Sequence, residues 1–89
     1  KKLSIKLAKH NINVNIISPG NIYFKNGNWF KKMKKNSVKT KKYINQNVPM
    51  KKFGTIKDVS NLCIFLSSDL SKFITGQIIA VDGGQSIKA

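Results

Sequence analysis

Hydrophobic and polar residues alternate over residues 12–17, which read Ile-Asn-Val-Asn-Ile-Ile. This period of two predicts a short buried strand. Pro19 cannot donate a hydrogen bond to a sheet and Gly20 permits close approach to the backbone, so we expect the strand to stop there. Helical patterns on either side make it a parallel strand of an α/β sheet. Ligands bind at the carboxyl ends of such strands, so Ser18–Phe24 is predicted to form one wall of a ligand site.

Two further segments carry the helical period. Residues 2–10 predict the end of an amphipathic helix, which Asn11 is expected to stop in a left-handed conformation. Residues 55–68 predict the most regular helix, because Thr55 and Asp58 have the spacing of a capping box.

Gln77–Val81 is a second apolar run, closed by the turn residues Asp82-Gly83-Gly84. It predicts a second buried strand. We expect the two strands to be parallel neighbours joined by a long crossover that contains the helices. The predicted fold class is therefore α/β, with the last two strands of a doubly wound parallel sheet.

Residues 21–52, called here the lid segment, differ in composition from the rest and carry most of the lysines. Two short helices are predicted in it. Trp29, Phe30 and Met33 share a face of the first, and Ser37 is positioned to cap the second. A partly helical insertion beyond the carboxyl end of a strand is often a substrate lid. The aromatic residues would then line an apolar pocket; alternatively, they form a stripe that packs on the main body.

The charge of the chain is extreme, with a formal net value of +14 from 17 lysines and no arginine. Such a balance is typical of proteins that bind nucleic acid or an anionic surface. Arginine is, however, the preferred residue for bidentate contacts to guanine and phosphate. Lysine is accompanied here by abundant asparagine and isoleucine, as AT-rich coding produces. We therefore favour a solvated lysine surface and keep a basic binding module as the alternative.

The length of 89 residues suffices for one small domain at most, and the chain opens inside a helical pattern without a cap. We expect it to be the tail of something longer. A single cysteine, Cys63, excludes a disulfide framework and is expected to be a small core residue. No apolar run has the length of a membrane span or the pattern of a signal peptide, so we expect a cytoplasmic protein without membrane partners.

Catalytic groups are scarce. The only carboxylates belong to Asp58, Asp69 and Asp82, and none is spaced as an acid/base pair. Ser18, His10 and Asp82 have the residue types of a nucleophilic triad, but no motif links them. No metal-ligand cluster and no glycine-rich phosphate loop are recognisable, so we predict no catalytic residue and no metal site in this chain.

Four segments in order nevertheless resemble one known family. They are Leu7-Ala8 with the strand and Ser18-Pro19-Gly20 turn that follow, Pro49–Gly54 with Asp58–Asn61, Phe65–Asp69, and Phe73–Gln77 with Val81–Gly84. Over nearly its whole length the chain is similar to the C-terminal part of the short-chain dehydrogenase/reductase family.

This resemblance implies a Rossmann fold and an NAD- or NADP-dependent oxidoreductase that moves hydride between the nicotinamide and an alcohol or ketone. Pro19, Gly20 and the backbone of Ile22 match the positions that line the nicotinamide and hold its carboxamide. Phe24 stands where the family usually has Thr or Ser. The substrate-lid residues would be Tyr23, Phe24, Trp29 and Met33, which suggest a partly apolar substrate.

The resemblance also locates what the chain lacks. The family's glycine-rich loop and its catalytic Ser, Tyr and Lys would lie upstream, in an absent N-terminal cofactor-binding half. Residues 1–89 would then be the C-terminal segment of a single domain, inactive alone. In the family's dimers or tetramers, the helix before Asn11 and the last helix and strand make subunit contacts, which implies a homo-oligomer. Two alternatives to a reductase part remain: a stand-alone basic nucleic-acid-binding module, and a truncated, non-catalytic interaction protein.

Overall fold

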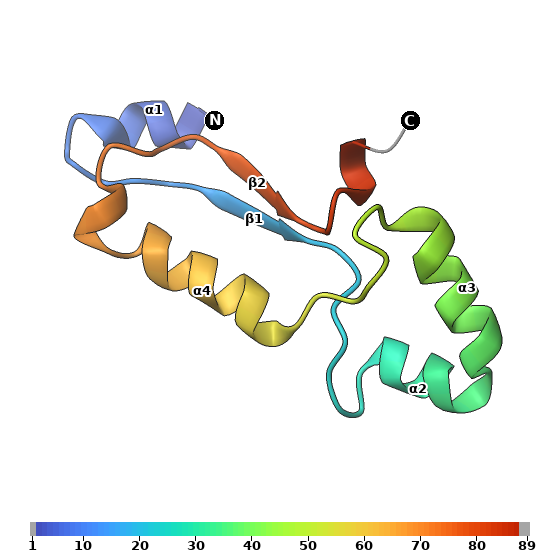
Figure 1. Cartoon of the computed structure of the whole chain (residues 1–89). Helices are drawn as coiled ribbons and strands as arrows, with labels where there is room; N and C mark the ends of the chain where they lie inside the picture. The colour runs from blue at the N-terminus through green and yellow to red at the C-terminus, as the bar shows by residue number, and fades with distance from the viewer. Residues whose placement is uncertain (1, 88–89) are drawn as a thin grey trace.

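The computed structural model describes residues 2–87, which form a two-stranded parallel sheet flanked by helices (Figure 1). The elements in chain order are α1 (Lys2–Ala8), β1 (Ile16–Pro19), α2 (Asn28–Lys35), α3 (Ser37–Asn47), α4 (Ile56–Leu66), the 3₁₀ turn η1 (Asp69–Ser71), β2 (Ile78–Val81) and the 3₁₀ turn η2 (Gln85–Ile87). The predicted α/β class is confirmed, and both strands and all the predicted helices are present.

The two strands pair in parallel, with Ile16 opposite Ile78 and Pro19 opposite Val81. Pro19 occupies the last position of β1, where its missing N–H interrupts no ladder. The crossover between the strands contains the lid segment and α4. Figure 1 shows α4 lying along the sheet, whereas α2 and α3 lie beyond its carboxyl edge. The crossover therefore brings the lid segment to the edge at which parallel sheets bind ligands.

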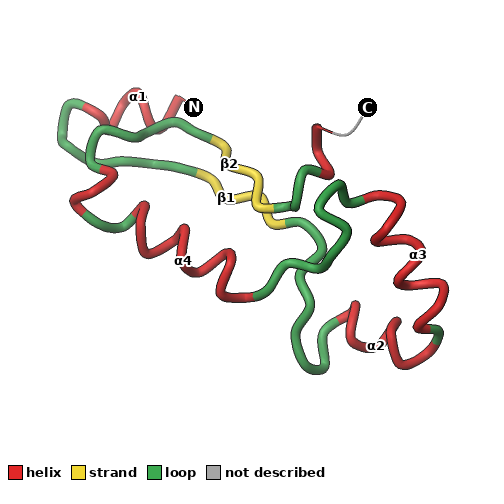
Figure 2. The backbone as a smooth tube through the Cα atoms, viewed as in Figure 1, coloured by secondary structure: helices red, strands yellow, loops and turns green. Residues whose placement is uncertain are grey.

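The regular part of β1 begins four residues later than predicted, at Ile16 rather than Ile12. Residues 12–15 run beside residues 74–77 (Figure 2), and side chains take part in two of the hydrogen bonds on either side of the backbone bond from Gly76 N to Val14 O. Val14 N donates to Thr75 Oγ1 at 3.0 Å, and Gln77 N donates to Asn15 Oδ1 at 3.0 Å. The side chains of Thr75 and Asn15 thus take backbone donors that a regular ladder would use.

The strands are less buried than their apolar sequence predicted. Ile16 and Ile78 remain 53% and 62% exposed, whereas Ile17 and Ile79 on the alternate face are half-buried. Successive strand residues point to opposite faces, so one face of the sheet is covered and the other is open. The cover comes from α4, which contacts β1 (Figure 1).

Helix α4 begins with the predicted capping box. Thr55 Oγ1 accepts a hydrogen bond from Asp58 N at 3.2 Å, and Asp58 Oδ2 accepts one from Thr55 N at 2.7 Å. The N–H and hydroxyl of Thr55 hold the pKa of the Asp58 carboxyl below its usual value, with a smaller contribution from Lys52. The expectation that Cys63 is a core residue is wrong for the described residues: it is exposed, because α4 has a packing partner on one side only.

Helices α2 and α3 pack against each other as a hairpin. The cap of α3 is Asn36, whose Oδ1 accepts from Lys39 N at 3.0 Å, so the prediction of Ser37 was wrong by one residue. Asn36 has the extended backbone that a cap requires, while Ser37 already lies in the helix. Thr40 Oγ1 donates to Lys32 O at 3.1 Å and fastens the two helices together. The α2–α3 hairpin is therefore held by its own contacts.

The best-buried apolar side chains lie at the end of this hairpin. Ile44 and Val48 are 3% and 2% exposed. Met50 N donates to Gly83 O at 3.1 Å, and a Cβ on Gly83 would lie 2.8 Å from Val48 Cγ1. Gly83 also has φ +64°, a conformation that glycine adopts without strain. The chain that leaves the lid segment therefore packs directly on the backbone of Gly83, where a side chain would not fit.

We expect the capping box to act in a peptide of residues 52–68. Thr55→Ala should cost about 0.5–2 kcal/mol of helix stability. The contribution of Asp58 should be complete above about pH 4 and be lost as the pH falls through its lowered pKa, because only the carboxylate accepts from Thr55. Circular dichroism at 222 nm against pH measures both effects.

The matched control is Asp69→Asn in a peptide extended to residue 72, because the Asp69 side chain makes no hydrogen bond within residues 2–87. Asp58→Asn should remove the acid transition and Asp69→Asn should keep it. An acid transition that survives Asp58→Asn would show that this cap is not its origin.

The 89 residues produced alone should not melt cooperatively. Each stranded Ile, Leu or Phe forfeits roughly 1.5–3 kcal/mol of burial. The open face of the sheet exposes several of these, and whole domains are stable by only about 5–15 kcal/mol. A thermal scan by circular dichroism checks this, and a sigmoidal transition independent of protein concentration would contradict it.

Candidate functional site

The carboxyl ends of the two strands approach each other closely at Gly20. Gly20 N donates to Val81 O at 2.9 Å, and a Cβ at this position would lie 2.6 Å from the Cβ of Asp82. No real Cβ tolerates that separation from another carbon, so only glycine fits this backbone path. Gly20 is the residue that lets the chain pass from β1 across the end of β2. Pro19, just before it, is exposed.

Beyond Gly20 the chain forms an isolated parallel bridge between Ile22 and Gly54. Gly54 N donates to Asn21 O at 3.0 Å, and Tyr23 N donates to Gly54 O at 2.9 Å. In such a bridge the flanking residues supply the bonded groups. The N–H and C=O of Ile22 itself therefore point away from Gly54, and neither makes a hydrogen bond within residues 2–87. Ile22 is half-buried, so this donor and acceptor form a polar pair beside the strand ends.

The turn after β2 is held by the Asp82 carboxylate. Its Oδ1 accepts from Gly84 N and its Oδ2 from Ser86 N, both at 2.9 Å. The Ser86 hydroxyl, followed by the Gly84 and Ser86 N–H groups, holds the pKa of Asp82 below its usual value. Across the strand end, Asn21 Nδ2 donates to Gln85 Oε1 and ties this turn to the chain after β1. Asp82 thus orders the turn, and its oxygens are occupied.

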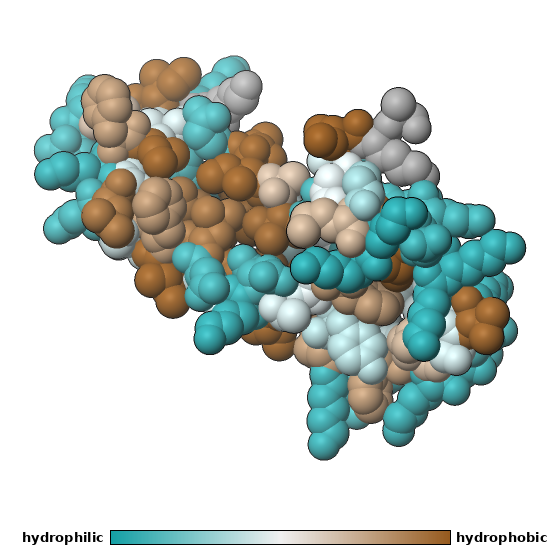
Figure 3. Space-filling model, in the orientation of Figure 1, coloured by the Kyte–Doolittle hydropathy of each residue, from teal (hydrophilic) through white to brown (hydrophobic). Residues whose placement is uncertain are grey.

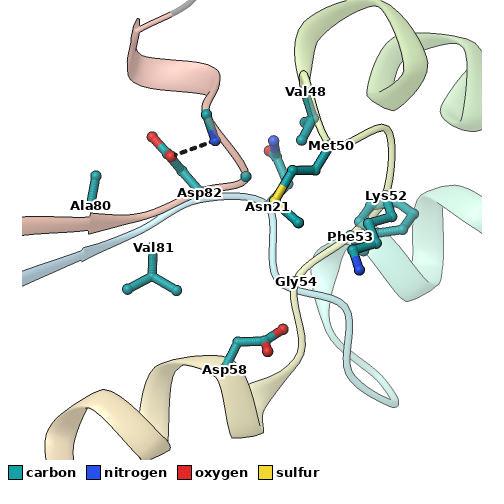
Figure 4. A pocket seen from close by; sticks show the side chains of 12 residues that line it. Asn21, Val48, Met50, Lys52, Phe53, Gly54, Asp58, Ala80, Val81 and Asp82 are labelled. Carbon is teal, nitrogen blue, oxygen red and sulfur yellow. Dashed lines mark hydrogen bonds between the residues drawn. The ribbon is translucent and has the colours of Figure 1, made fainter.

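A cavity of about 410 Å³ lies where these segments meet (Figure 4). Its lining comes from the chain after β1, the exit of the lid segment, the start of α4 and the turn after β2: Asn21, Val48, Met50, Lys52, Phe53, Gly54, Asp58, Ala80, Val81, Asp82, Gly83 and Gly84. Figure 4 shows Asp58 and Val81 on one side of the strand ends, with Ala80 and Asp82 on the other. The cavity therefore sits at the carboxyl edge, as the sheet topology requires.

The lid aromatics pack on one another and on Phe53. Trp29 stacks on Tyr43 with ring centroids 5.4 Å apart, and lies 5.5 Å from Phe53. Tyr23 lies 5.2 Å from Phe53 and 6.0 Å from Phe30. The cluster is internal to the lid and its exit.

The other two predicted lid residues lie apart from each other. The Phe24 ring contacts Gly27, where a Cβ would lie 2.8 Å from ring carbons, and it closes the turn before α2. Met33 lines a second cavity of about 620 Å³ together with Ile44 and Phe53. Phe24 is thus a turn residue in this structure, and Met33 belongs to a concave surface of the lid.

Sequence reasoning missed the central place of Phe53, which contacts two aromatic rings and lines both cavities. The sequence offered one indication of this role: Phe53 is an aromatic residue that precedes Gly54, at the boundary between the lid segment and the next predicted helix. The backbone of Ile22 was expected to matter from the family resemblance alone, whereas the bridge to Gly54 that leaves its N–H and C=O unbonded is a long-range feature that periodicity does not predict.

The structure does not bring together the residues of the nucleophilic triad that the sequence offered. His10 follows α1, at the end of the sheet opposite Ser18 and Asp82, so the three do not form a triad (Figure 1). Within residues 2–87, no group of three or more His, Cys, Asp or Glu side chains could hold a metal ion. None of the helices in that part of the chain combines the length and apolar character needed to cross a membrane.

Known proteins share this sequence and this arrangement. The family model described as Enoyl-(Acyl carrier protein) reductase matches residues 1–86. The NADPH-dependent reductase BacG of Bacillus subtilis is 42% identical over 89 residues, covering 94% of this chain and 34% of its own length. The 3-oxoacyl-[acyl-carrier-protein] reductase FabG of Buchnera aphidicola from Schizaphis graminum is 42% identical over 84 residues, covering 94% of this chain and 32% of its own.

Solved structures agree. YwfH, an NADPH-dependent reductase involved in bacilysin biosynthesis, superposes with a TM-score of 0.82 at 39% identity, over 99% of this chain and 35% of its own. 4-Hydroxyisoleucine dehydrogenase complexed with NADH gives a TM-score of 0.84 at 28% identity, over 99% and 35%. The chain spans about a third of the length of these relatives. From its sequence and its fold, the chain belongs to the short-chain dehydrogenase/reductase family.

Proposed function

We propose that this chain works as the C-terminal third of an NAD- or NADP-dependent oxidoreductase that transfers hydride between the nicotinamide and an alcohol or ketone. In that enzyme it supplies the turn beside the nicotinamide, the substrate lid and subunit contacts of a homo-oligomer. The catalytic Ser, Tyr and Lys come from the part of the enzyme upstream of this chain, so the 89 residues are inactive alone.

The observation that carries the proposal is the unbonded backbone of Ile22. A carboxamide has one acceptor oxygen and an N–H₂ donor, and Ile22 offers one N–H and one C=O without partners in residues 2–87. Gly20 keeps the turn between Pro19 and Ile22 close to the end of β2, because any Cβ at this position would collide with Asp82. Pro19 and Gly20 would line the ring and Ile22 would fix its carboxamide. When bound, the cofactor supplies or accepts the hydride.

The relatives support both forms of the cofactor, because one is named as NADPH-dependent and another is complexed with NADH. The choice between them is made outside this chain, which holds only the nicotinamide side. The substrate side follows from the lid: Tyr23, Trp29 and Met33 present an aromatic and thioether surface, which favours a partly apolar substrate. Phe24 would close the lid's first turn.

The bridge between Ile22 and Gly54 supports a functional link between cofactor and lid. It joins the start of the lid segment to the chain that leaves it, through two hydrogen bonds. The residue that would hold the carboxamide is therefore the same residue from which the lid starts. Movement of the lid and closure over a bound nicotinamide would then be coupled through one short bridge.

The first measurement is the intact mass of the native polypeptide from its source cells. We expect about three times the mass of this chain, the size of one large domain. That polypeptide should oxidise NADH or NADPH in the presence of ketones, and the 89 residues alone should not. A mass that matches the chain alone would contradict the proposal and leave the basic binding module and the interaction protein. Retention on a DNA column with a steep salt dependence would then favour the former.

In the complete reductase, Gly20→Ala should raise the KM for the cofactor and lower kcat/KM by at least about tenfold, because the new Cβ displaces the turn from Asp82. Steady-state kinetics measure both. The control is Asn61→Ala on the exposed surface of α4, which should leave both constants unchanged. A Gly20→Ala enzyme with a normal KM for the cofactor would remove this turn from the proposed cofactor site.

A further inference from the structure

The second cavity of the lid has an apolar floor. It lies between α2, α3 and the chain that leaves the lid, and encloses about 620 Å³. Met33 comes from α2, Ile44 from α3 and Phe53 from the exit segment, so three separate parts of the lid meet there. Ile44 is almost fully buried and Phe53 is part of the aromatic cluster, so the floor is fixed by packing.

The rim of the same cavity is cationic, formed by Lys41 and Lys42 of α3 and by Lys51 and Lys52 of the exit segment. No acidic residue occurs between residues 21 and 54. Lys52 also acts on the Asp58 carboxylate at the start of α4. The other three lysines face no carboxylate of their own segment. In the space-filling view the hydrophilic side chains gather over α2 and α3, while the apolar surface lies over the strands and α4 (Figure 3).

Lys51 occupies a position where its backbone is strained. Its φ is +59°, in the left-handed region that glycine and asparagine adopt readily and other residues rarely do. Its N–H donates to Val48 O at 2.7 Å, so the turn itself needs no side chain at this position. A lysine here brings a positive charge to the rim at a conformational cost that glycine would avoid.

We propose that this cavity binds the anionic end of an amphiphilic substrate, with a phosphate among the lysines and an aliphatic segment on Met33, Ile44 and Phe53. The inference rests on the proposed function, since it names the substrate class of the same lid. A phosphate suits the site better than a carboxylate, because it carries up to two charges and three acceptor oxygens for several ammonium groups. The alkyl part accounts for the apolar floor, which a free anion would not use.

Binding of simple probes tests this directly in the native polypeptide. Octyl phosphate combines both parts of the ligand, inorganic phosphate carries the charge alone, 1-octanol the chain alone, and octanoate a carboxylate. Isothermal titration calorimetry should give the tightest binding for octyl phosphate, weakened by added salt. Equal binding of octyl phosphate and 1-octanol, or of octyl phosphate and inorganic phosphate, would overturn the proposal.

The variants separate this cavity from general charge. The double substitution Lys41→Gln/Lys42→Gln should weaken the binding of octyl phosphate by at least about tenfold, the scale of one charged hydrogen bond. Lys35→Gln/Lys39→Gln removes the same charge from the same two-helix hairpin but outside the cavity lining, and should leave affinity within about twofold. Lys51→Gly should weaken binding while leaving or raising thermal stability, since it relieves the positive φ. Equal losses in both double variants would overturn the proposal.

Two further outcomes distinguish a failure of this inference from a failure of the proposed function. NAD(P)H-dependent reduction of neutral ketones with no selective binding of octyl phosphate would overturn this inference and leave the proposed function intact. Selective binding without any reduction would support the cavity and contradict the reductase. Co-sedimentation with vesicles containing phosphatidylglycerol, abolished by Lys41→Gln/Lys42→Gln and accompanied by no binding of monomeric octyl phosphate, would assign the lysines to a membrane surface and overturn the substrate site.

Discussion

The contact between Gly20 and the backbone at Asp82 sets the position of every part of the candidate site. A Cβ at Gly20 would lie 2.6 Å from the Asp82 Cβ, so the two strand ends are as close as two backbones can be. The chain leaving β1 is thereby directed over β2, where Ile22 can reach Gly54. The turn after β2 is stiffened by the Asp82 carboxylate and receives the exit of the lid on Gly83. A shift at Gly20 would displace the turn after β1 and both ends of the lid segment together.

The lid obeys a different constraint, because it packs mainly on itself. Trp29, Tyr43 and Phe53 join α2, α3 and the exit segment through ring contacts of 5.4 and 5.5 Å. Lys32 lies 4.4 Å from the centroid of the Trp29 ring, so part of the lysine surface also covers these aromatics. A lid with its own core can change its lining without disturbing the sheet. The strand ends would then define the chemistry, and the lid the substrate, within one short chain.

Local signals in the sequence were sufficient for the elements and for some of their ends. The capping pair Thr55–Asp58 and the left-handed Asn11, with φ 60°, are as predicted because each depends on neighbours in the chain. The family resemblance rests on spaced turns and is confirmed over residues 1–86. Features that depend on distant segments were not predictable from periodicity: the side-chain bonds of residues 12–15, the exposure of Cys63 and the bridge from Ile22 to Gly54. The family resemblance alone pointed to the backbone of Ile22. Periodicity reports which face of an element is apolar, whereas it does not report what covers that face.

The pairing of the two strands is also expected to be a slow step in folding. Asn15 and Gln77, which bond just before the strands begin, are 62 residues apart in the chain, and everything between them belongs to the crossover. Closing a loop of that length loses chain entropy before any ladder bond is gained, so contacts of this kind form late. During synthesis β1 leaves the ribosome well before β2 exists, while the α2–α3 hairpin can already fold from local contacts. The strand β2, which is translated after the whole crossover, therefore completes the sheet edge on which the candidate site is built.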